Sequence, residues 1–309
     1  MQRRDFLKSA VAGGLVSKAA AARPLPRRRY RDNVELSIIG FGGIVVVGAE
    51  QSEADRRVKA SFDRGVNYFD VAPSYWDGEA EQKLGLALRP LRDKVFLACK
   101  TQKRDAAGAR AELEQSLKRL HTDHFDLYQF HAITKMKEVE EILAPGGAAE
   151  TFLKAREQGK VRYLGCSAHS VEAALAMLDR FKLDSILFPF NFVCFGQGNF
   201  GPQVIARARE TGVARLALKA LAHTAWPKGT DRKATGYPKC WYKPVDDPKL
   251  ARQALYFTLS EDITAAIPPG DEKIYGLALD LAAAFKPLSA KERAQLLAST
   301  AGLEPIFRA

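Results

Sequence analysis

The feature that most constrains the fold is a regular alternation of short β-rich runs and amphipathic helical stretches after residue 32. Strict alternation predicts parallel strands joined by right-handed helical crossovers. The predicted strands are Ser37–Phe41, Asn67–Phe69, Lys94–Cys99, Phe125–Phe130, Val161–Cys166, Ser185–Phe188, Val213–Leu218 and Ile263–Ile267. The helical patterns lie near 53–64, 79–88, 107–120, 148–158, 170–181, 201–211, 248–260 and 272–285.

Eight such units favour an α/β fold of the (β/α)8 TIM barrel type. The main competitor is a doubly wound open sheet, which usually has a GxGxxG turn after its first strand. The turn here is Gly40-Phe41-Gly42-Gly43, and no acidic residue is placed to bind a ribose. We therefore expect one closed barrel over residues 32–285.

Four chemically active residues follow three consecutive predicted strands: Asp70, Tyr75, Lys100 and His131. The carboxyl ends of barrel strands carry the catalytic residues, so these four should share one rim. Reduction of a carbonyl needs a proton at oxygen, and a tyrosine with an ordinary pKa near 10 is a weak acid. A nearby Lys100 ammonium should lower that pKa. Asp70 would hold Lys100 in place, and His131 would orient the carbonyl.

Several ordered blocks of sequence resemble the aldo-keto reductase family. They are Gly65–Tyr75, Lys94–Lys100, Ser116–Leu120 followed by Asp126–His131, and Gly159–Ser167. The resemblance implies an oxidoreductase that transfers hydride between a nicotinamide cofactor, NADP or NAD, and a small carbonyl or alcohol, with sugars among the candidates. It also implies general acid/base catalysis by Tyr75. The cofactor contacts expected on this basis are Gly42, Ser167, Lys219 and Gly270.

The resemblance is incomplete at the positions that bind the nicotinamide cofactor in this family. The Asn expected after Ser167 is Ala168, the Gln of the sixth strand is Leu187, and the aromatic residue after the seventh strand is Leu218. Asp271-Glu272-Lys273 replaces the basic cluster for the 2′-phosphate of NADP. An alternative is therefore a catalytically altered barrel that acts as a nucleotide- or ligand-binding regulatory module. A redox-neutral epimerase or lyase with Tyr75 as base is a third reading.

The amino terminus has the pattern of an export signal. Arg3-Arg4-Asp5-Phe6-Leu7-Lys8 precedes a weakly apolar stretch that ends in Ala20-Ala21-Ala22. This order predicts a twin-arginine signal peptide and a basic arm over residues 1–31, with the export machinery as a partner and a periplasmic or exported protein. The subgroup of the family implied is therefore one with a twin-arginine leader. The run Arg27–Arg29 is expected to be a solvated part of that arm.

Charge and cysteine content exclude other classes. Residues 1–31 hold nine Lys and Arg residues and one acid, so most of the net charge of +11 lies there rather than on the barrel. We therefore expect no nucleic-acid partner. No apolar stretch is long enough for a membrane span. The four cysteines lack CxxC spacing, so no metal site is predicted.

Two further segments are set apart from the barrel pattern. Residues 222–247 form a long aromatic loop after the seventh strand, which places them on the catalytic face. Trp226, Tyr237, Trp241 and Tyr242 could stack there on a sugar ring. Residues 286–309 are expected to form a tail with a helix at Ala290–Ala298.

Overall fold

The computed structural model describes residues 24–309 and places eight parallel strands in one barrel. In chain order the barrel strands are β3 (Phe41–Gly42), β4 (Tyr68–Asp70), β5 (Phe96–Thr101), β6 (Phe125–Ile133), β7 (Val161–Ala168), β8 (Ser185–Pro189), β9 (Ala214–Leu218) and β12 (Ala265–Ile267). Each strand pairs with the next one in this order. The cylinder closes where Gly40 N donates to Ala266 O at 2.9 Å and Ala266 N donates to Ile38 O at 2.9 Å. The predicted (β/α)8 barrel is confirmed.

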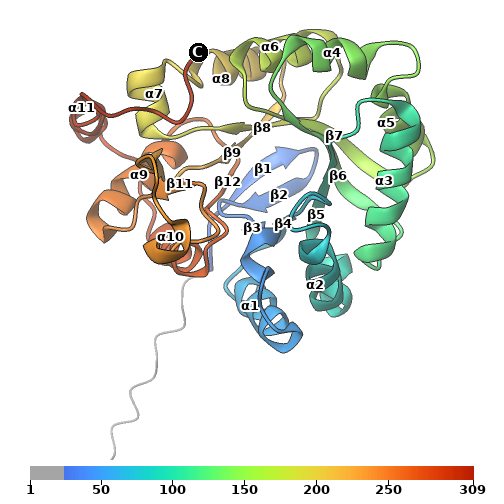
Figure 1. Cartoon of the computed structure of the whole chain (residues 1–309), viewed down its shortest axis with the longest axis horizontal. Helices are drawn as coiled ribbons and strands as arrows, with labels where there is room; N and C mark the ends of the chain where they lie inside the picture. Colours follow the sequence, from blue (N-terminus) through green and yellow to red (C-terminus); the bar gives the residue numbers. More distant parts are fainter. Residues whose placement is uncertain (1–23) are drawn as a thin grey trace, which may run out of the picture.

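Helices surround the strands on the outside of the barrel (Figure 1). They are α1 (Gln51–Asp63), α2 (Glu79–Leu88), α3 (Ala106–Arg119), α4 (Met136–Leu143), α5 (Ala148–Glu157), α6 (Val171–Arg180), α7 (Phe192–Gly198), α8 (Pro202–Glu210), α9 (Pro248–Ser260), α10 (Glu272–Ala283) and α11 (Ala290–Ala298). The short helices α4 and α7 follow β6 and β8 and were not predicted. Both follow strand ends on the rim, where extra helices are insertions in the β-to-α connections rather than part of the repeat.

The first predicted strand, Ser37–Phe41, is divided between two sheets. Ser37 ends β2 (Val34–Ser37), which pairs antiparallel with β1 (Arg27–Arg31), and the barrel strand β3 begins only at Phe41. The prediction of one continuous strand is therefore wrong. The division has a physical reason, because Ser37 N donates to the Asn67 side chain at 2.7 Å and Ile38 N donates to Pro26 O at 3.0 Å, so neither amide bonds to a neighbouring barrel strand.

The hairpin of β1 and β2 closes the amino-terminal end of the barrel. Figure 1 shows it lying across the middle of the ring of strands. Tyr30 is buried there; its hydroxyl donates to Ser185 Oγ at 3.0 Å, and its ring packs edge-on against Phe96 and Tyr163. These three partners lie at or near the amino-terminal starts of their strands, which places the hairpin opposite the catalytic rim.

The interpretation of Arg27–Arg29 as a solvated arm is correct only in part: Arg27 and Arg29 are exposed, but the three residues belong to strand β1 and Arg28 is half-buried. The Arg28 guanidinium donates to Ile263 O at 2.5 Å and to Leu259 O at 2.7 Å. Arg31 forms an ion pair with Asp184 at 3.1 Å. A run of three arginines is normally solvated, but here carbonyls at the barrel floor accept from Arg28. The leader sequence up to residue 23 lies outside the described residues.

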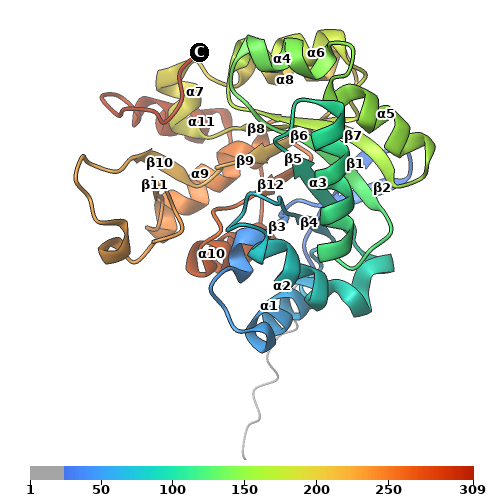
Figure 2. The ribbon, with the colours of Figure 1, turned by 45° about the vertical axis from the view of Figure 1, so that its right-hand side comes forward.

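The 222–247 loop contains its own small sheet. Strands β10 (Ala222–Ala225) and β11 (Tyr242–Pro244) pair antiparallel, and Figure 2 shows them projecting beside the barrel mouth. Trp226 stabilises the loop from within, because its indole N–H donates to Cys240 O at 2.9 Å. Tyr237 does the same through a 2.9 Å hydrogen bond to Asp246. These two aromatics are therefore packing residues of the loop.

Within residues 24–309, the four cysteines are free and buried, and no helix is long and apolar enough to cross a membrane.

We predict that Tyr30→Ala destabilises the protein by about 3–5 kcal/mol, as expected for loss of a large buried ring. Tyr30→Phe should cost only about 1 kcal/mol, because it removes one hydrogen bond. Urea unfolding followed by circular dichroism measures both. Arg29→Ala is the control, since Arg29 is an exposed residue of the same strand. If Tyr30→Ala proved as mild as Arg29→Ala, the hairpin would not be part of the folded core.

Candidate active site

A buried ion pair lies at the carboxyl end of β4 and β5. Lys100 is fully buried, and its ammonium pairs with the Asp70 carboxylate and donates to Val71 O at 3.1 Å. The second Asp70 oxygen accepts from Tyr68 OH at 3.3 Å and from Gln129 Nε2 at 3.1 Å. Every oxygen of this carboxylate therefore has a donor, as a buried charge requires.

Tyr75 and His131 complete the predicted group of four. The Lys100 ammonium donates its third bond to Tyr75 OH at 3.3 Å and lies 5.0 Å from the centre of the Tyr75 ring. The His131 ring meets the Tyr75 ring edge to face at 5.7 Å. The structure thus brings together all four residues that the sequence placed on one rim.

The electrostatics of Tyr75 differ from the expectation. Burial raises the pKa of Tyr75, and the Lys100 ammonium lowers it by less, so the net direction is upward. The prediction that Lys100 would bring the pKa below its ordinary value is wrong, because it omitted the cost of placing a phenolate in a water-poor cavity. Tyr75 is therefore a phenol at neutral pH, ready to donate a proton.

His131 is held neutral. Burial lowers the pKa of its imidazole well below the usual range, and the positive charge of Lys100 acts in the same direction. Its Nδ1 lies 3.4 Å from Ser74 Oγ. A hydroxyl that donates to Nδ1 leaves the imidazole proton on Nε2, where it can serve a ligand oxygen. Arg104 fixes the backbone at this point by donating to His131 O at 2.7 Å.

A cavity of about 110 Å³ lies beside Tyr75 and contains three of the four predicted cofactor contacts. Gly42, Lys219 and Gly270 line it together with Asp70, Leu218, Ile267 and Trp241. Ser167 lies apart from it, buried at the end of β7, where its Oγ accepts from Ala132 N at 3.3 Å. The 222–247 loop reaches the cavity through Lys239, Cys240, Trp241 and Tyr242, which confirms its predicted place on the catalytic face.

The glycines of this cavity have a packing role. A Cβ on Gly270 would collide with the Ile44 side chain. A Cβ on Gly42 would lie 3.2 Å from Ile267 Cγ2. Both glycines therefore allow a neighbouring side chain to pack against the backbone at the cavity wall, whether or not a ligand is bound.

The residues fit a nicotinamide dinucleotide in part. An apolar wall of Leu218 and Ile267 suits the nicotinamide ring, and the Lys219 cation suits the diphosphate. Two of the carboxamide contacts expected for the family are missing, because Leu187 packs into the apolar barrel interior and Ala168 is a buried alanine; Ser167 is retained. The cavity is also below the 300–1,000 Å³ of drug-sized ligand sites, so it does not by itself enclose a whole dinucleotide.

The position expected for a 2′-phosphate is negatively charged. Asp271 caps α10 and accepts from Lys273 N at 3.0 Å and Ile274 N at 3.4 Å. Glu272 follows it and pairs with Lys239 at 3.3 Å. The helix N-terminus that could hold a phosphate is thus already satisfied by a carboxylate, and a second one stands beside it.

Some residues of the site were missed from the sequence. Tyr68 and Gln129 each stand two residues before a predicted catalytic residue, so the period of a strand puts them on the same face, and this signal could have found them. Phe307 lies far from the motifs, but its ring is 5.4 Å from His169 and 5.9 Å from Trp241. No local pattern in the tail indicates that it reaches the rim.

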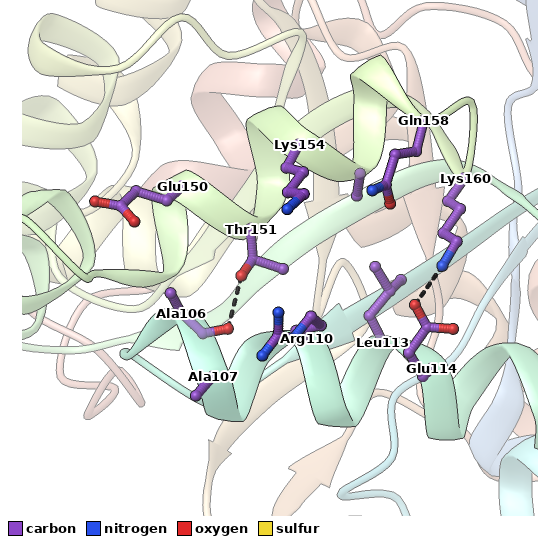
Figure 3. Close-up of a pocket in the computed structure, with 11 residues that line it drawn as sticks. Ala106, Ala107, Arg110, Leu113, Glu114, Glu150, Thr151, Lys154, Gln158 and Lys160 are labelled. Atoms are coloured by element: carbon purple, nitrogen blue, oxygen red, sulfur yellow. Dashed lines mark hydrogen bonds and ion pairs between the residues drawn. The ribbon is translucent and has the colours of Figure 1, made fainter.

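A separate groove of about 400 Å³ runs between α3 and α5 (Figure 3). Thr151 donates across it to Ala106 O at 2.6 Å, and Lys160 forms an ion pair with Glu114. It shares no lining residue with the catalytic cavity. Within residues 24–309, no cluster of three or more His, Cys, Asp or Glu residues could hold a metal ion.

The sequence profile of the Aldo/keto reductase family matches residues 39–286 of this chain. The aldo-keto reductase YhdN of Bacillus subtilis is 34% identical over 179 residues, which are 51% of each chain. The methylglyoxal reductase YeaE of Escherichia coli is 34% identical over 144 residues, 45% of this chain and 48% of that protein. The chain thus spans about half the length of these two curated relatives.

Solved structures share the fold over nearly the whole chain. The holo form of aldo-keto reductase AKR11C1 from Bacillus halodurans has a TM-score of 0.68 at 23% identity and covers 92% of this chain and 100% of its own. An aldo-keto reductase from Klebsiella pneumoniae, solved in complex with NADPH, has a TM-score of 0.67 at 21% identity and covers 93% of this chain and 98% of its own.

We predict that Lys100→Met destabilises the protein by about 3–5 kcal/mol, because it leaves the buried Asp70 charge without its cation. The double variant Lys100→Met/Asp70→Asn should be more stable than Lys100→Met alone, since it removes both charges. Thermal unfolding measures the difference. Arg180→Ala, which breaks an exposed ion pair with Glu140, is the control and should leave the melting temperature unchanged. Additive effects of the two site substitutions would contradict the coupling.

Proposed function

Because the chain belongs to the Aldo/keto reductase family, we propose that it is an oxidoreductase that interconverts a small carbonyl compound and its alcohol with Tyr75 as general acid/base. One observation carries the proposal: Tyr75 OH lies 3.3 Å from a buried ammonium that is itself fixed by a buried carboxylate. The relatives named above are an aldo-keto reductase and a methylglyoxal reductase, which supports a small carbonyl substrate.

The proton chemistry follows from the four residues. The substrate oxygen accepts hydrogen bonds from the Tyr75 hydroxyl and from the neutral imidazole of His131. As negative charge develops on that oxygen, Tyr75 transfers its proton, and the Lys100 ammonium stabilises the phenolate that remains. Burial opposes the charge on Lys100, but Asp70 and Tyr75 outweigh it and raise the pKa of Lys100, so the cation persists throughout.

A bound nicotinamide dinucleotide supplies or accepts the hydride. Gly42, Lys219 and Gly270 are the proposed contacts in the cavity, and Ser167 is proposed as a carboxamide donor from the end of β7. Of the two cofactors we favour NAD, because Asp271 and Glu272 would repel the 2′-phosphate of NADP. This preference is tested by identifying the nucleotide that the purified protein releases on denaturation and by comparing kcat/KM with NADH and with NADPH.

We predict that Tyr75→Phe lowers kcat for carbonyl reduction by about 10²–10⁴-fold, the range for loss of a general acid. The matched control is Tyr237→Phe, the same change in the neighbouring loop, which should leave kcat within twofold of wild type. A broad screen of small aldehydes with NADH is the assay. Wild-type protein that binds nucleotide, seen as quenching of Trp241 fluorescence, but never turns over would instead support the regulatory module.

The pH dependence gives a second readout of the same proposal. Reduction needs the phenol form of Tyr75, which is present below its pKa and is lost as pH rises through it. Since burial raises this pKa above its ordinary value near 10, reductive kcat should show no alkaline limb due to Tyr75 below about pH 10. A limb near pH 8 that disappears in Tyr75→Phe would contradict the assigned environment.

We also propose that the protein is exported by the twin-arginine route, with residues 1–22 as the signal. It would then belong to a subgroup of the family that carries such a leader. The Arg3-Arg4-Asp5-Phe6-Leu7-Lys8 pattern supports this. Proteins that fold before export can carry a tightly held cofactor, which would supply a nicotinamide nucleotide outside the cytoplasm.

We predict that replacing Arg3 and Arg4 together by Lys retains the protein in the cytoplasm, because the paired guanidinium groups are the recognised feature of the signal. Cell fractionation and immunoblotting measure the distribution. Lys18→Arg, which also conserves charge but lies outside the pair, is the control and should be exported. Equal export of the two variants would refute the route.

A further inference from the structure

Gln129 is an amide buried inside the barrel beside the catalytic ion pair. It belongs to β6 and lies opposite Lys100 in the register of β5 and β6. The residue is fully buried, and it stands two positions before His131, so both side chains lie on the same face of the strand. The proton transfer from Tyr75 does not involve the atoms of Gln129 directly.

The direction of the amide is fixed by its neighbours. Gln129 Nε2 donates to Asp70 Oδ2 at 3.1 Å, and the same oxygen accepts from Tyr68 OH at 3.3 Å. An ionised carboxylate can only accept hydrogen bonds, so the NH2 group must face Asp70 and the carbonyl must face away. Among residues 24–309, no group donates to the buried Gln129 Oε1. An acceptor in this state costs stability, so packing alone does not account for an amide here.

The neighbouring strand leaves space for this amide. Gly165 of β7 pairs with Gln129, and a Cβ on Gly165 would lie 3.1 Å from Gln129 Cγ. It would also lie 3.0 Å from Ser185 Oγ and 3.0 Å from Leu127 Cδ1. These distances are shorter than ordinary van der Waals contact, so a larger residue at this position would press on the glutamine. The absence of a side chain at Gly165 therefore lets Gln129 keep its contact with Asp70.

The hydrogen bonds lead from Gln129 to the general acid. Asp70 Oδ1 pairs with the Lys100 ammonium, whose other bonds go to Val71 O at 3.1 Å and to Tyr75 OH at 3.3 Å. The bond to Tyr75 is the longest of the three, so a small shift of the ammonium would break it first. Rotation of the Asp70 carboxylate would cause such a shift. Gln129 opposes this rotation because it holds the second carboxylate oxygen.

We propose that Gln129 is a positioning residue for carbonyl reduction. It fixes the Asp70 carboxylate, and through it the Lys100 ammonium, so that this cation stays on the Tyr75 oxygen as the phenolate forms. The inference rests on the proposed function of Tyr75 as general acid. Because Gln129 reaches the site through Asp70, it acts on the rate of proton transfer rather than on the binding of substrate.

The test replaces Gln129 with Met, which has a similar length but no donor. We expect kcat for carbonyl reduction with NADH to fall about 10–100-fold, because a displaced ammonium stabilises the phenolate less. KM should stay within about twofold of wild type, since substrate binding is not altered. Circular dichroism at the assay temperature checks that the variant is folded.

The matched control is Gln203→Met in α8. Within residues 24–309, the buried Oε1 of Gln203 also lacks a donor, while its Nε2 donates to Asn199 O at 2.9 Å. The same substitution is thus made at an amide with the same pattern of bonds, away from the catalytic residues. Gln203→Met should leave kcat unchanged.

A double-mutant cycle shows whether Gln129 acts through Asp70. In the Asp70→Asn background, Gln129→Met should change kcat by less than about twofold, since the carboxylate that it positions is gone. Equal losses in the two backgrounds would overturn the proposal, as would a Gln129→Met enzyme with the kcat of wild type. If Gln129→Met fails to fold, Gly165→Ala takes its place, because the added Cβ displaces the amide without removing it. It should lower kcat and leave KM unchanged.

Crystal structures of wild type and Gln129→Met provide a readout that needs no turnover. In the variant, the distance from Lys100 Nζ to Tyr75 OH should exceed about 3.5 Å, the limit of a hydrogen bond. An unchanged contact would overturn the role of Gln129. If wild-type protein reduced no carbonyl compound, the proposed function would fail instead, and the two structures would still decide whether Gln129 positions Lys100.

Discussion

The whole site depends on one interaction, the ion pair between Lys100 and Asp70 inside the barrel. A lysine with no exposed surface keeps its charge only because a carboxylate compensates the loss of water, and that carboxylate is in turn held by Tyr68 and Gln129. The ion pair therefore has both a structural role and a chemical one. It places a permanent positive charge against the Tyr75 oxygen, and this charge adds to the effect of burial in keeping His131 neutral.

The rim is asymmetric around this pair. On the side of Tyr75 and His131 hydrogen bonds link Asp70, Lys100 and Tyr75, and the arrangement suits proton transfer to an oxygen. On the side of β9 and β12 the cavity has an apolar wall with Lys219 beside it, and it ends at a helix N-terminus that Asp271 already caps. A cofactor bound here would therefore make fewer specific contacts than in a typical site of this type. The size and the charge of the ligand would then mainly determine which ligand binds.

The sequence was informative where the fold repeats itself and where chemistry leaves a motif. Eight βα units predict the barrel, and position at strand ends predicts that Asp70, Tyr75, Lys100 and His131 converge. What it could not reveal depends on contacts between distant segments. Nothing local to Arg28 indicates that its guanidinium would meet Ile263 O, and nothing near Phe307 indicates that the tail would reach His169. Predicting the pKa of Tyr75 also required knowledge of burial, because burial raises it by more than the Lys100 ammonium lowers it.

The hairpin at the barrel floor has a consequence for how the mature polypeptide can be processed. Leu25 and Tyr30 are buried, and Arg28 and Arg31 contact the amino-terminal end of the barrel, so residues from Leu25 onward belong to the folded unit. A protease that cuts the chain after Ala22 would leave the β1–β2 hairpin complete. A cut beyond Arg31 would remove β1 and expose the amino-terminal end of the barrel interior to water. If the proposed signal is removed, a cut before Leu25 is therefore the one that keeps the hairpin intact.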